Sequence, residues 1–136
     1  MTDLRIADVR VTPIAFADPP LLNNAGCHQP FALRSIIEVE TEDGVVGLGE
    51  SYGATAVVDG IAAAGKAMVG RKVTDLNALW AAAQGGGRAE GYTGAEAVVP
   101  RVVAAIEVAM WDALGKATGQ RVVDLLGGQV RERVPF

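Results

Sequence analysis

The chain has 136 residues, 50% hydrophobic and 21% charged, with a formal net charge of −4. This composition excludes intrinsic disorder, and the length suits one domain with a sizeable core. The 16 acidic and 12 basic residues argue against nucleic-acid binding, which needs a basic face. No apolar run is long enough to span a membrane. The lone cysteine, Cys27, and the lack of a signal-peptide pattern predict a cytoplasmic protein.

The first third of the chain predicts strands. Residues 6–16, 32–41 and 45–50 alternate apolar and polar side chains, and Asp43-Gly44 predicts a tight hairpin before the third strand. We therefore expect a three-stranded antiparallel meander. Glu38, Glu40 and Glu42 fall on one face of the second strand, and we interpret them as a solvated sheet face, because they line a strand instead of surrounding a point.

Two predicted loops and one glycine-containing strand are candidates for a functional role. Residues 18–30 and the glycine-rich stretch 85–93 predict loops, and a loop of the first length inside a compact domain is usually functional or disordered. The segment Gly47-Leu48-Gly49-Glu50 lacks the third glycine of a dinucleotide fingerprint. We interpret its glycines as a bulge or a close approach of two backbones.

The remainder of the chain predicts helices over residues 55–69, 75–84, 95–117 and 121–126. In the second of these helices, we expect Leu76, Leu79 and Trp80 to point inward. The third carries an apolar stripe with spacings of three and four residues: Val99, Val102, Val103, Ile106, Met110, Ala113 and Leu114. Strands followed by helices predict the α+β class. Residues 131–136 predict the start of one more strand.

Several motifs resemble the N-terminal capping domain of the enolase superfamily, in its mandelate racemase and muconate lactonising branch. They are the Asp43-Gly44 hairpin with the GLGE segment after it, residues 106–116 (IEVAMWDALGK), Gly119, and residues 123–128 (VDLLGG). The resemblance covers essentially the whole chain. It implies a capping domain over residues 1–128, with residues 129–136 forming a linker and the start of the first strand of a (β/α)₈ barrel.

A narrower match lies in the first loop, which resembles the specificity loop of D-glucarate dehydratases. It rests on Asn23, Gly26, His28, Pro30 and Phe31, with Arg34 in the next strand. The resemblance implies that Asn23, His28 and Thr93 contact a sugar diacid. The chemistry agrees, because imidazole and amide groups can donate hydrogen bonds to carboxylate and hydroxyl oxygens. Such a site rejects analogues that lack a hydroxyl, since its polar groups would be left unpaired.

The resemblance also implies a reaction. In that family Mg²⁺, held by three acidic residues on barrel strands, binds the substrate carboxylate, a lysine or a His-Asp pair removes the α-proton, and the β-hydroxyl leaves as water. This chain has no Lys-x-Lys motif and one histidine. We therefore expect no catalytic residue and no metal ligand here, and an isolated chain that is inactive without its barrel.

Three functions stay open at this point. The chain is the lid of a glucarate-dehydratase-like lyase, a non-catalytic binding module that keeps the capping fold, or the capping domain of another acid-sugar dehydratase or racemase. The expected partners are the sugar diacid and the barrel, with neither nucleic acid nor membrane. Because the barrel would cover apolar surface, we also expect the isolated chain to associate with itself as a homo-oligomer.

Overall fold

A computed structural model describes residues 3–17, 30–85 and 95–135. Three strands form one antiparallel sheet in the order β1-β2-β3: β1 (Ile6–Ala17), β2 (Phe31–Thr41) and β3 (Val46–Tyr52). In the register, Ile37 of β2 lies opposite Val11 on one side and Gly49 on the other. The predicted meander is confirmed. Its hairpin turns at Gly44, whose φ of 78° is the left-handed value that glycine adopts readily.

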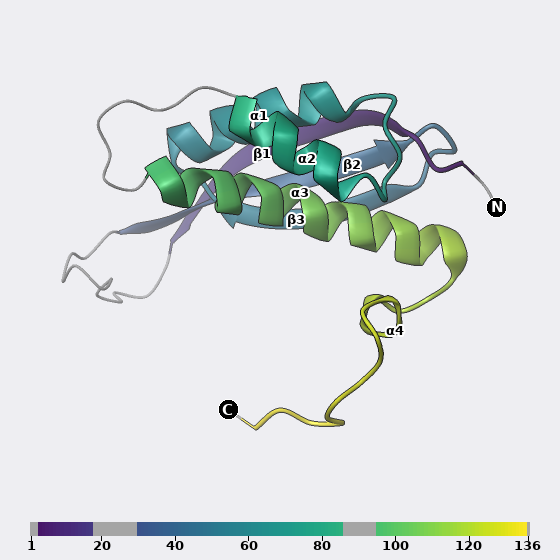
Figure 1. Cartoon of the computed structure of the whole chain (residues 1–136). Helices are drawn as coiled ribbons and strands as arrows, with labels where there is room; N and C mark the ends of the chain where they lie inside the picture. Colours follow the sequence, from purple (N-terminus) through teal and green to yellow (C-terminus); the bar gives the residue numbers. More distant parts are fainter. Residues whose placement is uncertain (1–2, 18–29, 86–94, 136) are drawn as a thin grey trace.

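The helices are α1 (Thr55–Met68), α2 (Leu76–Gly85), α3 (Ala95–Thr118) and the short α4 (Val122–Leu125). Figure 1 shows α1, α2 and α3 stacked over one face of the sheet, so the α+β class is confirmed. α3 begins at Ala95 although Pro100 lies within it. None of the helices in residues 3–17, 30–85 and 95–135 has the length and apolar character that crossing a membrane requires.

The core fills the space between the helices and the covered face of the sheet. Alternation in β2 places Ile37 and Val39 inward, both fully buried, while Glu38 and Glu40 point to the open face. The helices contribute side chains that are buried to the same degree: Val57, Ile61, Met68, Leu79, Val102, Val103, Ile106 and Met110. The apolar stripe predicted for α3 is therefore the face that packs on the core.

β3 and α3 approach each other at the backbone. A Cβ atom at Gly47 would overlap the carbonyl oxygen of Ala109 and lie 2.8 Å from the Cβ of Ala113. A Cβ at Gly49 would overlap the carbonyl oxygen of Ala105. The interpretation of these glycines as a close backbone approach is confirmed, and the GLGE segment has a packing role.

Trp80 differs from the expectation. Leu79 is fully buried, as predicted, but Trp80 is 42% exposed. Successive helical residues are about 100° apart around the axis, so the position next to the most buried one points sideways. The expectation of an inward Trp80 was wrong, because with Leu79 facing the core Trp80 lies at the border of the buried face.

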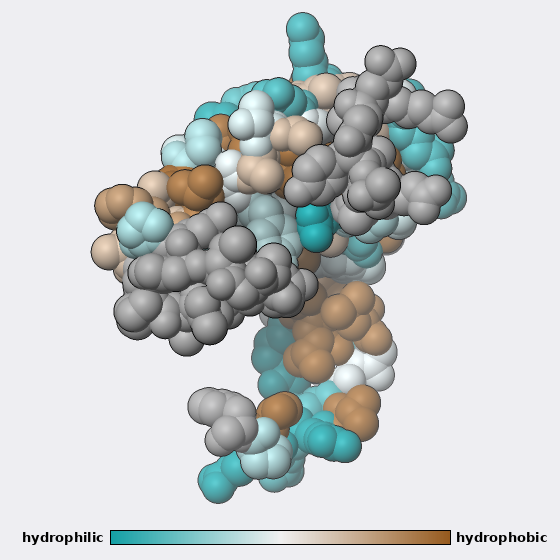
Figure 2. All heavy atoms as spheres, turned by 90° about the vertical axis from the view of Figure 1, so that its left-hand side faces the viewer, coloured by the Kyte–Doolittle hydropathy of each residue, from teal (hydrophilic) through white to brown (hydrophobic). Residues whose placement is uncertain are grey.

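The C-terminal segment extends away from the sheet and the helices that cover it (Figure 1). α4 is followed by residues 129–135, which have no regular secondary structure. Figure 2 shows apolar side chains gathered on α4, below the main body. Leu126, Val130 and Val134 are between 63% and 95% exposed. A strand needs a neighbour for its hydrogen bonds, so the strand start at residues 131–136 stays a prediction about a longer chain.

Candidate functional site

The three predicted substrate-contacting residues, Asn23, His28 and Thr93, lie outside the described residues. The elements next to them in the sequence are described. β1 ends at Ala17, β2 begins at Phe31, and α3 begins at Ala95, two residues after Thr93. These three ends lie at the same side of the molecule, the left of Figure 1. The described residues at this end of the sheet are therefore the ones in which we look for a binding surface.

An open hollow of about 340 Å³ lies where β2 and β3 meet α3. Its residues come from two sources, the strands (Arg34, Glu50, Ser51 and Tyr52) and α3 (Arg101, Ala104, Ala105 and Val108). Short alanine side chains on α3 leave the space, and the strand residues supply the polar groups. The hollow is a surface on which a small polar ligand or another chain segment can lie.

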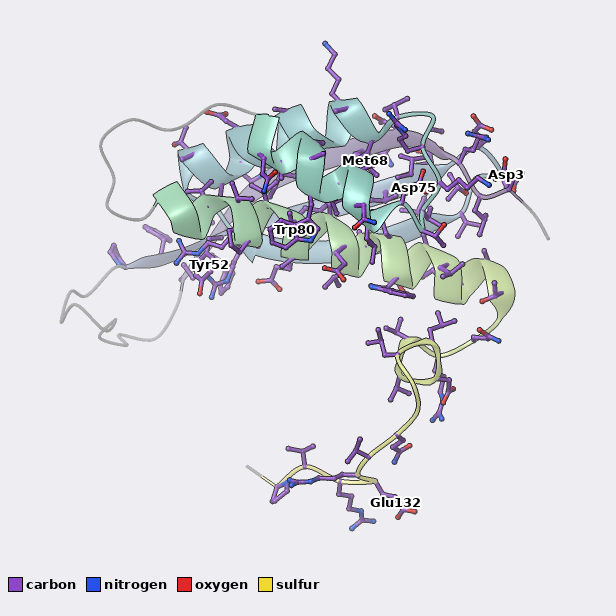
Figure 3. All side chains as sticks on the ribbon, viewed as in Figure 1. Asp3, Tyr52, Met68, Asp75, Trp80 and Glu132 are labelled. Carbon is purple, nitrogen blue, oxygen red and sulfur yellow. The ribbon has the colours of Figure 1, made fainter. Side chains whose placement is uncertain are left out.

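The aromatic ring of Tyr52 lies close to both guanidinium groups that line this hollow. The Cζ atom of Arg101 lies 4.9 Å from the centre of the Tyr52 ring, and that of Arg34 lies 5.2 Å from it. Both distances are within the range of a cation–π interaction. Figure 3 shows Tyr52 at the end of β3, beneath the first part of α3. We call Arg34, Tyr52 and Arg101 the Tyr52 cluster.

Backbone and side-chain contacts hold the strand part of the Tyr52 cluster. Arg34 and Tyr52 lie opposite each other in the β2–β3 register. The buried Ser35 hydroxyl donates a hydrogen bond of 3.1 Å to the carbonyl oxygen of Tyr52. The Arg34 Nε atom lies 3.1 Å from Glu50 Oε1 in an ion pair. The hollow thus holds two positive groups and one negative group, which suits an anionic partner.

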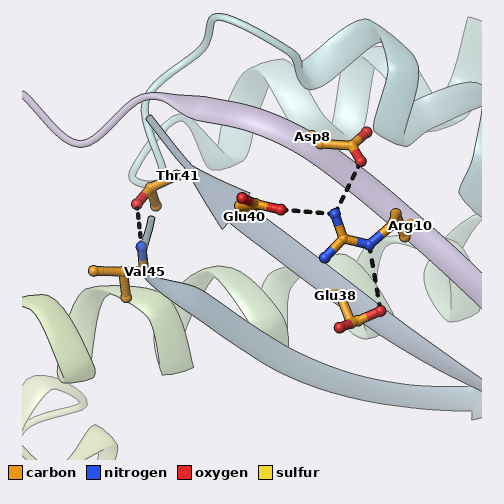
Figure 4. A network of polar contacts seen from close by, with 6 residues as sticks. All are labelled: Asp8, Arg10, Glu38, Glu40, Thr41 and Val45. Carbon is orange, nitrogen blue, oxygen red and sulfur yellow. Dashed lines mark hydrogen bonds and ion pairs between the residues drawn. The ribbon is translucent and has the colours of Figure 1, made fainter. Parts of the chain in front are cut away.

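A second polar cluster lies on the open face of the sheet (Figure 4). Arg10 donates hydrogen bonds to Glu40 at 2.7 Å, Asp8 at 3.2 Å and Glu38 at 3.4 Å. The hydrogen bond to Glu40, followed by that to Glu38, raises the pKa of Arg10 above its ordinary value. This supports the predicted solvated face for Glu38 and Glu40, with one addition: their charges are paired across the strands. These are ion pairs at the surface of the sheet, and we assign them a structural role.

Within residues 3–17, 30–85 and 95–135, no group of three or more His, Cys, Asp or Glu residues is arranged to hold a metal ion. The Mg²⁺ that the resemblance implies therefore has no donor set in the described part. The described side chains can bind and orient a ligand.

From the sequence, Arg34 is named as part of the first-loop resemblance, whereas Tyr52 and Arg101 have no predicted role. The three are far apart in the chain, and only the β2–β3 register and the placement of α3 bring them together. A usable signal was present for one pair, since the Asp43-Gly44 hairpin predicts which residues of the two strands lie opposite each other. Nothing in the sequence places Arg101 over that pair.

A family model described as mandelate racemase / muconate lactonizing enzyme, N-terminal domain, matches residues 6–127. A Streptomyces coelicolor protein named "Probable glucarate dehydratase" is 44% identical over 98% of this chain and 34% of its own length. A D-galactonate dehydratase of Variovorax paradoxus is 34% identical over 72% of this chain and 25% of its own length.

Solved structures show the same fold. An enolase of Pseudomonas fluorescens with bound magnesium, potassium and tartrate has a TM-score of 0.91 and 39% identity, over 100% of this chain and 34% of that one. An enolase of Mycobacterium smegmatis complexed with tartrate has a TM-score of 0.87 and 47% identity, over 98% of this chain and 33% of that one. The chain thus spans about a third of the length of these relatives.

Proposed function

Because the chain belongs to the mandelate racemase and muconate lactonizing enzyme N-terminal domain family, we propose that it is the substrate-capping domain of an acid-sugar dehydratase of the glucarate type. The observation that carries this proposal is the 44% identity to the Streptomyces coelicolor protein across 98% of the chain. Similar proteins of known structure hold tartrate, a small hydroxylated diacid, which supports a diacid substrate.

In this proposal the chain binds and selects the substrate. His28 donates a hydrogen bond to the distal end of the diacid, and Asn23 and Thr93 contact its polar groups. The base, Mg²⁺ and its acidic ligands belong to a C-terminal barrel outside this chain. Residues 1–128 form the cap, and residues 129–136 lead into the barrel. The cytoplasmic compartment stays part of the proposal and rests on the single Cys27.

The experiment joins this chain to a catalytic domain from the glucarate dehydratase relative and compares His28→Ala with the unchanged protein. Loss of one hydrogen bond to a charged group costs about 1.5–3 kcal/mol, or roughly 10–150-fold in kcat/KM for the diacid. Asn23→Ala and Thr93→Ala should show smaller losses, because both side chains are neutral.

A substrate without the distal carboxylate is the control. It offers His28 nothing to contact, so His28→Ala should change its kcat/KM much less. An equal loss for both substrates with a lower melting temperature would indicate a structural role. Unchanged diacid kinetics in a folded enzyme would remove the glucarate assignment.

Two alternatives from the sequence analysis stay open, and one of them has an observation in its favour. The similarity to the D-galactonate dehydratase favours a cap with another acid-sugar substrate, and an activity screen of the joined enzyme against acid sugars separates the two. A non-catalytic module that keeps the capping fold is the second. The DNA downstream of the coding sequence decides this case: a continuation with Lys-x-Lys and three acidic strand ends supports the dehydratase, and a stop before an unrelated gene supports the module.

A further inference from the structure

The Tyr52 cluster joins three elements at the end of the molecule where β1 ends and β2 and α3 begin. Arg34 lies three positions after Phe31, the first residue of β2, and Arg101 lies six positions after Ala95, the first residue of α3. Tyr52 is the last residue of β3. The ring is therefore in contact with both elements that follow the segments holding the predicted substrate contacts.

Other contacts between α3 and the sheet are concentrated further along the helix. The close backbone approach at Gly47 and Gly49 involves residues 105–113. Asp112 and Lys116 bind the backbone of β3 still nearer to the C-terminal end of α3. Near Arg101, the hydrogen bond found in the described residues runs from the Ser51 hydroxyl to the Arg101 carbonyl oxygen, at 3.5 Å. This distance is long for a hydrogen bond, so the cluster is the main polar link at this end, beside the apolar packing of Val102 and Val103 in the core.

The aromatic ring has a specific role in this link. Two guanidinium groups repel each other, and among the described residues the ion pair of Glu50 is with Arg34. The face of the Tyr52 ring attracts both cations, so the ring lets Arg34 and Arg101 converge where direct contact would be unfavourable. An aliphatic side chain of similar size offers no such attraction.

We propose that Tyr52 is a positioning residue that holds the start of β2 against the first turns of α3 through Arg34 and Arg101. The proposal rests on the proposed function, because it fixes the start of β2 and the start of α3 relative to each other, and the proposed substrate contacts precede both in the sequence. Tyr52 itself makes no contact with substrate in this proposal.

Hydrogen exchange of the full chain tests the link without any activity. Tyr52→Leu should raise exchange of backbone amides over residues 31–36 and 98–102 by about fivefold, as expected for two exposed cation–π contacts. Tyr52→Phe keeps the ring face and should exchange like the unchanged protein. Arg101→Gln should raise exchange too, and the double variant should exchange no faster than Tyr52→Leu, because one link has been broken twice.

Val108→Ala is the matched control, because Val108 lines the same hollow and is 54% exposed but lies outside the Tyr52 cluster. It should leave exchange of both segments unchanged. Equal exchange in Tyr52→Leu and the unchanged protein would overturn the proposal, and so would strictly additive effects of Tyr52→Leu and Arg101→Gln.

Kinetics of the joined enzyme provide the second readout. Tyr52→Leu should raise KM for the diacid by about fivefold with little change in kcat, and Tyr52→Phe should restore it. A KM unchanged in Tyr52→Leu would overturn the positioning role. If the unchanged joined enzyme dehydrates no acid sugar, the proposed function fails, whereas hydrogen exchange still decides whether Tyr52 holds β2 against α3.

Discussion

Asp112 and Lys116, one turn apart on α3, each form a hydrogen bond with the backbone of β3. Asp112 Oδ2 accepts a hydrogen bond of 2.8 Å from the Leu48 amide, and Lys116 Nζ donates one of 2.8 Å to the Val46 carbonyl oxygen. The two side chains also form an ion pair at 2.6 Å. An edge strand with unpaired backbone groups is a template for aggregation, so these side chains protect β3 as well as fixing the helix.

Asp112→Ala should lower the free energy of unfolding by about 1 kcal/mol at neutral pH, because it removes the acceptor of the Leu48 amide and the partner of Lys116. Chemical denaturation measures this change. Asp124→Ala is the control: its partner Arg121, just before α4, has a side chain that is 67% exposed, and such surface pairs contribute little. Equal effects of the two substitutions would contradict the role given to Asp112.

The effect of Asp112→Ala should depend on pH. Desolvation opposes ionisation of Asp112, but the hydrogen bonds from Lys116 and the Leu48 amide outweigh it and lower the pKa below the ordinary 3.8. A carboxyl with a lowered pKa stabilises the folded state above its unfolded pKa and loses this effect as pH falls through the folded value. The difference between Asp112→Ala and the unchanged protein should therefore be constant from about pH 5 upward and shrink below about pH 4.

At the scale of elements, the packing of α3 on β3 depends on two glycines, which have no side chain. Gly47 and Gly49 alternate with Leu48 and Glu50, so both glycines face the helix and neither adds a Cβ. The backbone of α3 can then approach the sheet closely enough for Asp112 and Lys116 to reach β3.

Gly47→Ala should destabilise the chain by about 2–3 kcal/mol, because the new Cβ would overlap backbone atoms of α3 that cannot rotate away. Gly85→Ala is the matched control: it lies at the end of α2, and a Cβ there meets no atom within 4 Å. Its effect should be neutral or slightly stabilising. Thermal unfolding of both variants checks this pair, and a Gly47→Ala variant as stable as Gly85→Ala would contradict the close approach.

At the scale of the whole molecule, large apolar side chains are exposed in two regions of the surface. The part of β1 and β2 beyond the helices exposes Ile14, Phe16, Phe31 and Leu33 to between 38% and 53%, and the C-terminal segment adds Leu126, Val130 and Val134. Contiguous exposed apolar surface on a monomer usually marks an interaction site. The proposed barrel would cover part of it.

The isolated 136-residue chain should therefore associate with itself or bind a dye specific for exposed apolar surface. Size-exclusion chromatography with light scattering and a dye-binding assay measure both properties. A monomer that binds no dye would show that these side chains form no apolar association surface in the isolated chain.

The same isolated chain should not dehydrate D-glucarate in the presence of Mg²⁺, since the proposed base and metal ligands lie outside it. The assay is product formation by the pure chain against a blank without protein. Product above the blank would show that residues of this chain suffice for the reaction.

How much the sequence could predict varies with the range of the interaction involved. Alternation in residues 32–41 and the Asp43-Gly44 turn are local patterns, and the strand, its buried face and the hairpin follow from them as observed. Trp80 was predicted to point inward, but helix geometry turns it about 100° from Leu79, and the packing of the whole fold decides which of the two is buried. For the candidate site, Asn23, His28 and Thr93 rest on the resemblance alone.

The sequence by itself determined the elements, their order and the family of this protein, because hydrophobic periodicity, turn residues and motif spacing are properties of neighbours along the chain. Only the tertiary structure decided that Tyr52 meets Arg34 and Arg101, that α3 lies on the backbone of Gly47 and Gly49, and that Asp112 closes the edge of β3. These contacts join residues that lie far apart in the chain; Leu48 and Asp112, for example, are 64 positions apart. Such pairs come together through the packing of whole elements, which no local pattern encodes.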